Sequence, residues 1–435
     1  MQETANDSRD FSKQNQVGIL GVHSAYAALD LFVSVFLVAR LLSVTDGDFS
    51  RVALFYACCW GGILLTFWLF SYVVKKFSRV WCIRGSAIGL LVGVILVLLL
   101  ENNLREWYLL LGAVWGVASG IYWCSMHTFT SEALGGKKMS GYAAWYFITN
   151  AFMRIVFPFT LGAIIESPKL GFVAAAAIAT GLAVVLVLFT LILRDRRKSE
   201  GKRFSVRTFL RLIRERKLSR PIWSQFWIQF LYGLQSVMTL GITILVFLSL
   251  QSNFSLGALT SIFAGVSIVA LAIYKPIKSQ RVKIWIYYVT SILPILAAIG
   301  LLFGASPLTV ILCQAGYFSF RVVSNTELER ARMNLMADFG AEHLHTEGLL
   351  FTEVSYVLAR FVGLGLILAI YFSGVLYLFQ VLLVLLATTV LLAAVLLHLW
   401  TRRHMSSTTP SPSVPPLRSK GEYQGGVSPP QFRVE

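Results

Sequence analysis

Charged residues are scarce in this sequence. Asp, Glu, Lys and Arg make up 14% of its 435 residues, whereas soluble domains carry about 25%. Hydrophobic residues make up 56%. A chain with so few charges and so many apolar side chains does not fit a soluble globular protein, and its composition is typical of a protein that folds in a membrane.

Cysteine and enzyme motifs are also sparse. The five cysteines lie in or beside apolar runs, without the CxxC or Cys/His spacing of zinc sites. There is no P-loop and no nucleophile elbow, and the HLH run at 343–345 lacks the HExxH spacing. We therefore predict no metal site, no disulfide framework, no cofactor, no catalytic residues and no enzymatic activity.

Acidic residues are fewer than basic ones, which gives a net charge of +17. In a membrane protein this excess is expected in cytoplasmic loops, so nucleic acid is not a predicted partner. A span needs roughly 20 apolar residues. The sequence predicts twelve spans, at 17–42, 51–74, 80–100, 105–130, 141–165, 170–193, 222–250, 256–274, 282–303, 307–329, 346–371 and 375–400.

The loops between these spans alternate in charge. Lys and Arg gather after the even-numbered spans, whereas the opposite loops are short and hold at most one basic residue each. The positive-inside rule then places both termini in the cytoplasm. We predict an all-α polytopic membrane protein with a polar N-terminus at 1–16, a six-helix bundle at 17–193, a basic central loop at 194–221, a second six-helix bundle at 222–400, and a disordered tail at 401–435.

This layout resembles the major facilitator superfamily over about residues 17–400. After the second span, Lys76 and Arg79 occupy basic positions of that family's pattern G-x-x-x-D-[RK]-x-G-[RK]-[RK], while Lys75 stands at the acidic position. In the fifth span, Pro158 and Gly162 fit the pattern G-x-x-x-G-P-x-x-G-G, which is associated with exporters.

The resemblance implies a secondary transporter that works by alternating access between its two bundles. Spans 1, 4, 7 and 10 would then line a central cavity. We expect a monomeric, multi-pass protein of the plasma membrane or the bacterial inner membrane. Its partners would be a small-molecule substrate, protons and membrane lipids.

Polar side chains inside the spans mark the candidate site, because an ionisable group in lipid is costly unless it faces protein or water. These side chains recur every three or four residues in spans 1, 4, 7 and 10, so that each set shares one helix face. The alternative is that the histidines, glutamines and threonines only join helices together. The predicted cavity residues are Tyr26, Asp30, Tyr122, Trp123, His127, Gln229, Tyr232, Tyr317 and Arg321.

Charges in and beside the spans predict coupling and gating. Asp30 is the first candidate for proton loading, because a low dielectric disfavours its charged form, and Arg321 would attract an anionic or polar substrate group. The alternative role for some of these charges is structural: Glu353 and Arg360 share a helix face as an ion pair would, and Glu132 lies near basic loops that it could brace. The predicted coupling and gating residues are Asp30, Glu132, Arg154, Glu353 and Arg360.

A mixed aromatic and polar cavity suits amphipathic organic solutes. We predict proton-coupled efflux of drug-like or metabolite molecules, with uptake of an organic anion as the alternative. Two other classes stay open. One is a receptor or scaffold that does not transport and signals through residues 194–221, and the other is a lipid flippase with a lateral opening.

Overall fold

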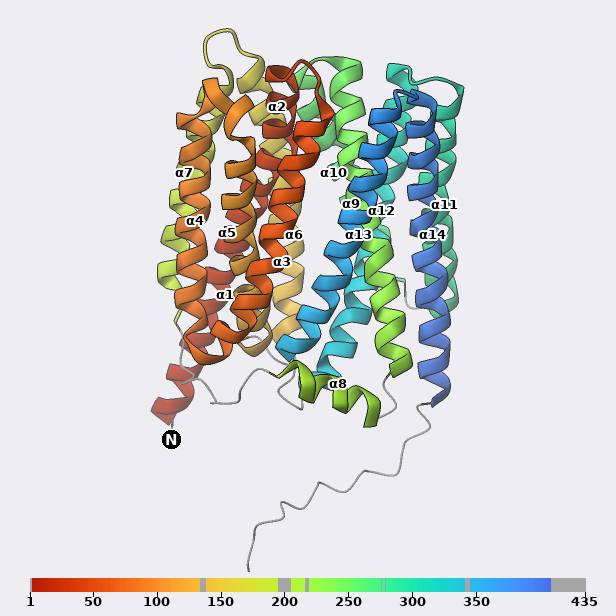
Figure 1. Cartoon of the computed structure of the whole chain (residues 1–435). Helices are drawn as coiled ribbons and strands as arrows, with labels where there is room; N and C mark the ends of the chain where they lie inside the picture. The colour runs from red at the N-terminus through yellow and green to blue at the C-terminus, as the bar shows by residue number, and fades with distance from the viewer. Residues whose placement is uncertain are drawn as a thin grey trace, which may run out of the picture.

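Long helices stand side by side in the computed structural model of the chain (Figure 1). It describes residues 2–133, 138–194, 205–215, 219–274, 276–277, 279–340 and 345–407. Within these ranges there is no β-strand. Helix is the expected structure in lipid, because it satisfies every backbone hydrogen bond within its own segment.

Eleven helical stretches in the described ranges are long and apolar enough to cross a membrane. One further long helix, α12, packs against α9, α10 and α11. Together they agree with the predicted twelve spans of an all-α membrane protein. The helices are α1 (Gln2–Leu31), which continues through the π-helical turn η1 (Phe32–Leu37) into α2 (Val38–Val44), then α3 (Phe49–Lys76), α4 (Arg79–Leu99), α5 (Leu104–Ala133), α6 (Lys138–Glu166), α7 (Gly171–Ile192), α9 (Ser219–Leu250), α10 (Asn253–Tyr274), α11 (Gln280–Ile299), α12 (Pro307–Gly340), α13 (His345–Ser373) and α14 (Leu376–Ser407).

Two helix sets lie next to each other, with α1 to α7 on the left of Figure 1 and α9 to α14 on the right. Helices pack mainly within their own set, and the principal contacts between the sets are α6 against α10 and α3 against α13. The two-bundle architecture predicted from the sequence is therefore present. α3 and α13 therefore contact each other between the bundles, although neither helix was predicted to line the cavity.

A glycine row on α5 allows the closest helix contact in the first bundle. Gly112, Gly116 and Gly120 are spaced by four residues and face α3. A Cβ atom at Gly116 would overlap the carbonyl oxygen of Cys59. Small residues let backbones approach in this way, which is how membrane helices gain packing energy where lipid offers no hydrophobic drive.

The turn between α2 and α3 is fixed by polar contacts. Asp48 caps α3 by accepting a hydrogen bond from the Ser50 N–H at 3.0 Å, and it accepts another from the Ser50 hydroxyl at 2.6 Å. The hydroxyl contact is the main reason that the pKa of Asp48 lies below its usual value. Asp46, in the same turn, has a left-handed backbone (φ 55°).

The central connection carries a short amphipathic helix, α8 (Val206–Glu215), on the same end of the bundle as the start of α1 and the end of α14 (Figure 1). The Ser205 N–H donates to the Glu347 carboxylate at 3.0 Å. Phe209 is buried and lies 6.2 Å from Phe351, ring to ring. This segment is therefore attached to the start of α13. The charge asymmetry of the loops predicts that this end faces the cytoplasm.

Filling the α3–α5 contact should destabilise the first bundle. We expect Gly116→Ala to lower the melting temperature of the purified protein, because overpacking a tight contact costs about 1–3 kcal/mol. The matched control is Gly85→Ala in α4, where a Cβ meets no atom within 4 Å. Differential scanning fluorimetry measures both variants, and equal melting temperatures would contradict the assigned contact.

Candidate functional site

The aromatic residues predicted in α1 and α5 form one cluster. The rings of Tyr26 and Tyr122 stack at 4.0 Å with an interplanar angle of 8°. The Tyr122 hydroxyl and the His23 Nδ1 are hydrogen-bonded at 2.6 Å, and the Trp123 indole N–H donates to the Tyr26 hydroxyl at 3.0 Å. Trp123 also stacks on His127 at 5.0 Å.

Exposure divides this cluster into two parts. Tyr122 is fully buried and Tyr26 is 5% exposed, so their rings hold α1 and α5 together. Trp123 and His127 are half-buried, so these two side chains keep surface that a solute can contact. The cluster therefore has a buried part that packs α1 against α5 and a half-buried part with accessible aromatic surface.

Asp30 lies one helical turn beyond Tyr26, two residues before the start of the π-helical turn η1. Such turns frequently occur at functional sites. The Asp30 side chain is half-buried, and it makes no hydrogen bond or salt bridge with the rest of the described chain. The positive charges that act on its carboxylate come from Arg154 of α6 and Arg360 of α13. Asp30 is therefore within electrostatic range of cations from both bundles.

Arg321 of α12 lies among aromatic rings of the second bundle. Its guanidinium carbon is 5.4 Å from the ring centre of Tyr232 and 5.1 Å from that of Tyr317. Its Nη1 donates to the Thr239 hydroxyl at 2.5 Å. Tyr317 is fully buried and donates to the Gln235 carbonyl at 2.5 Å, so its ring packs against Arg321 within the protein and has no exposed surface.

Arg360 connects the two bundles. Its guanidinium carbon lies 3.8 Å from the ring centre of Tyr356 and 5.2 Å from that of Trp60, which belongs to α3. Tyr356 in turn stacks on Tyr232 at 5.3 Å and 19°. A continuous series of rings and cations, which we name the aromatic–arginine chain, thus runs from Trp60 through Arg360, Tyr356 and Tyr232 to Arg321.

Sequence reasoning missed two members of this chain. Tyr356 precedes Arg360 by one helical turn, and that i, i+4 spacing was the available signal. Trp60 lies within a long apolar run and carries no comparable signal. Both were missed because the spacing within one helix does not report which other helix it meets.

The remaining predicted residues take more scattered positions. Arg154 is exposed, and its Nε donates to the Asn150 side-chain oxygen at 3.3 Å. Glu353 is half-buried and acts electrostatically on Arg360. Gln229 is 4% exposed, and its Nε2 has no hydrogen-bond partner in the described part of the chain. The side chain of Glu132 lies outside the described residues.

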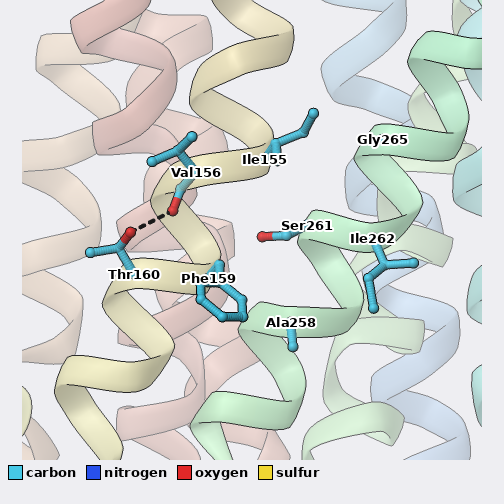
Figure 2. A pocket seen from close by; sticks show the side chains of 8 residues that line it. All are labelled: Ile155, Val156, Phe159, Thr160, Ala258, Ser261, Ile262 and Gly265. Atoms are coloured by element: carbon cyan, nitrogen blue, oxygen red, sulfur yellow. Dashed lines mark hydrogen bonds between the residues drawn. The ribbon is translucent and has the colours of Figure 1, made fainter.

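A separate groove of about 480 Å³ lies between α6 and α10, at the contact between the bundles (Figure 2). Its lining is almost entirely apolar, and the Thr160 hydroxyl there is already bonded to the Val156 carbonyl at 2.8 Å. None of the described residues that line it is charged. The groove resembles a surface for lipid tails more than a site for a polar group. Its residues are Ile155, Val156, Phe159, Thr160, Ala258, Ser261, Ile262 and Gly265.

The sequence matches a protein-family model and a curated protein. A model of the Major Facilitator Superfamily matches residues 19–329. An uncharacterized protein, YqgE of Bacillus subtilis, is 25% identical over 255 residues, which is 58% of this chain and 57% of that protein. The chain thus matches little more than half the length of this curated relative.

Solved transporter structures share the fold. The crystal structure of nucleoside transporter NupG has a TM-score of 0.59 and 14% identity, covering 90% of this chain and 99% of that one. A bacterial homologue of the iron transporter ferroportin, in its outward-facing state, has a TM-score of 0.62 and 16% identity, with 90% and 100% covered. The POT family transporter PepTSo has a TM-score of 0.64 and 12% identity, with 92% and 99% covered.

If the charged residues border water, cysteines in their place should react with a charged reagent. We expect Asp30→Cys and Arg321→Cys to react with a membrane-impermeant methanethiosulfonate well above the rate of the parent protein and its five native cysteines. The matched control is Ser86→Cys, because Ser86 is fully buried. Labelling of both test sites no faster than the control, measured by mass spectrometry, would contradict a wet cavity.

Proposed function

This chain belongs to the Major Facilitator Superfamily, it is a multi-pass membrane protein of a secondary-transporter family, and we propose that it exports small amphipathic organic solutes in exchange for protons. The observation that carries the proposal is the aromatic–arginine chain, which joins both bundles and has Asp30 beside it. Asp30, Arg321 and Arg360 are ionisable groups deep in membrane helices, where isolated charges are too costly to persist without function.

The side chains around these charges indicate what kind of solute the site would bind. The half-buried rings of Trp123, Tyr232 and Tyr356 offer flat apolar faces with polar edges. Such rings bind molecules that combine an apolar body with a polar group. This supports amphipathic solutes over simple inorganic ions or sugars, which call for dense hydrogen-bonding groups instead.

Proton coupling rests on the position of Asp30. Its carboxylate is attracted by Arg360 of the other bundle, and protonation would remove that attraction. Loading a proton would therefore weaken one electrostatic link between the bundles and favour their rearrangement. A group whose charge changes the bundle contact is what alternating access requires.

We propose export as the direction, since a proton that enters down its gradient can drive an amphipathic solute outward. The second candidate is uptake of an organic anion. It is supported by the positive charges of Arg360 and Arg321, which are joined through the stacked rings of Tyr356 and Tyr232. A lipid flippase would need a lateral opening, and none of the described residues that line the groove between α6 and α10 is charged to hold a lipid head group.

Neutralising Asp30 should remove coupling. We expect wild-type protein in liposomes to move protons when an aromatic carboxylate, amine or alcohol is added under a pH gradient. In Asp30→Asn, gradient-driven flux should fall to the level of protein-free liposomes, measured with an internal pH-sensitive dye. Solute labelled on one side gives the direction of transport.

The control for this experiment is Asp46→Asn. Asp46 lies in the exposed α2–α3 turn, where its side chain is 89% exposed, and Asn tolerates its left-handed backbone. This variant should keep wild-type flux. Unchanged flux in Asp30→Asn would remove Asp30 from coupling, and the absence of any flux in wild type across the whole panel would overturn the transport proposal.

A further inference from the structure

The charges around the aromatic–arginine chain are unevenly balanced. Arg360 has two carboxylates acting on it, those of Asp30 and Glu353. The groups that act on Arg321 are the tyrosines Tyr317, Tyr232 and Tyr356, and none of them is a carboxylate. Among the described residues Arg321 has no salt bridge. Within the described part of the chain it is therefore a membrane-embedded cation with no carboxylate counterion.

The guanidinium of Arg321 also has unused hydrogen-bonding capacity. An arginine carries five N–H donors in a planar fork. Nη1 donates to the Thr239 hydroxyl and the guanidinium also hydrogen-bonds with the Tyr232 side chain, whereas Nε is buried and has no partner in the described part of the chain. A buried N–H donor of a charged group that has no acceptor costs free energy. A bound anion would supply both the missing charge and the missing acceptors, because carboxylates and phosphates match the arginine fork.

Aromatic rings extend from this guanidinium toward the first bundle. Tyr232 lies beside Arg321, and Tyr356 stacks on Tyr232 while it contacts Arg360. Both tyrosines are half-buried, so part of each ring remains open. A planar ring attached to the anionic group would meet these open aromatic edges, and ring pairs of this kind add attraction beyond simple burial.

Arg321 has no carboxylate partner among the described residues and lies beside two stacked tyrosines, and from this we propose that the transported solute is an aromatic organic anion. Its carboxylate or phosphate binds Arg321, and its ring lies against Tyr232 and Tyr356. A cationic solute would be repelled by both Arg321 and Arg360, and a neutral one would leave Arg321 unbalanced. This inference rests on the proposed transport function and names the substrate class of the same site.

Binding to the purified full-length protein tests this inference without requiring transport. Isothermal titration measures the affinity of 2-naphthoate and 2-naphthyl phosphate, which separate carboxylate from phosphate recognition. Three matched probes test charge and aromaticity, namely neutral 2-naphthylmethanol, cationic 2-naphthylmethylamine and the saturated anion decahydro-2-naphthoate. The variants are Arg321→Gln, Arg321→Lys and, as a control for loss of one positive charge, Arg105→Gln. The Arg105 side chain is 57% exposed.

We expect one or both aromatic anions to bind wild type and Arg105→Gln equally, and to bind Arg321→Gln about 10- to 100-fold more weakly, as for loss of a charge-assisted contact. Arg321→Lys should fall between them, since it keeps the charge and loses the fork. The neutral, cationic and saturated probes should bind wild type more weakly than 2-naphthoate.

Three results would overturn the inference. The first is equal binding of 2-naphthoate to wild type and to Arg321→Gln. The second is tighter binding of the neutral or cationic probe, and the third is no binding of either aromatic anion. If liposome flux of other solutes persists in these cases, the protein is still a transporter and only the substrate class is wrong. If the anions bind but nothing is ever moved, the transport proposal fails instead.

Discussion

The structure depends on the free-energy cost of placing ionised side chains in the low-dielectric interior of a membrane. A charge there is tolerated only against protein, water or an opposite charge. Asp30, Arg321 and Arg360 meet this constraint in different ways. Arg321 and Arg360 lie on tyrosine and tryptophan rings, and Asp30 stands near two cations without a direct salt bridge. None of them is neutralised by a close ion pair among the described residues.

Arg360 lies where the two bundles meet. Trp60 belongs to the first bundle and Arg360 to the second, so their contact exists only while α3 and α13 are close. In contrast, Tyr26 and Tyr122 stack within the first bundle, and the glycine row of α5 fixes α3 beside it. Tight packing within a bundle and polarizable contacts between bundles together favour motion of two rigid bodies.

Helical spacing predicted part of this site and not the rest. The stripes of spans 1 and 4 predicted the cluster of Tyr26, Tyr122, Trp123 and His127, because side chains three or four apart share a face. Trp60 was not predicted, because its contact with Arg360 joins two helices that are far apart in the chain. The π-helical turn after Asp30 was also unpredicted, because no proline or glycine in that run signals it. Composition was enough to predict the membrane fold, while the direction, the solute and the coupling ion depend on contacts that no single stretch of sequence contains.

The central claim is that Asp30 and Arg321 border a water-filled passage between the bundles. An experimental density map of the protein in lipid nanodiscs, at a resolution that shows ordered water, tests it most directly. The account predicts solvent density that reaches both side chains and continues to one face of the membrane. A map in which both side chains point into lipid, or are sealed in a dry contact remote from any opening, would contradict it.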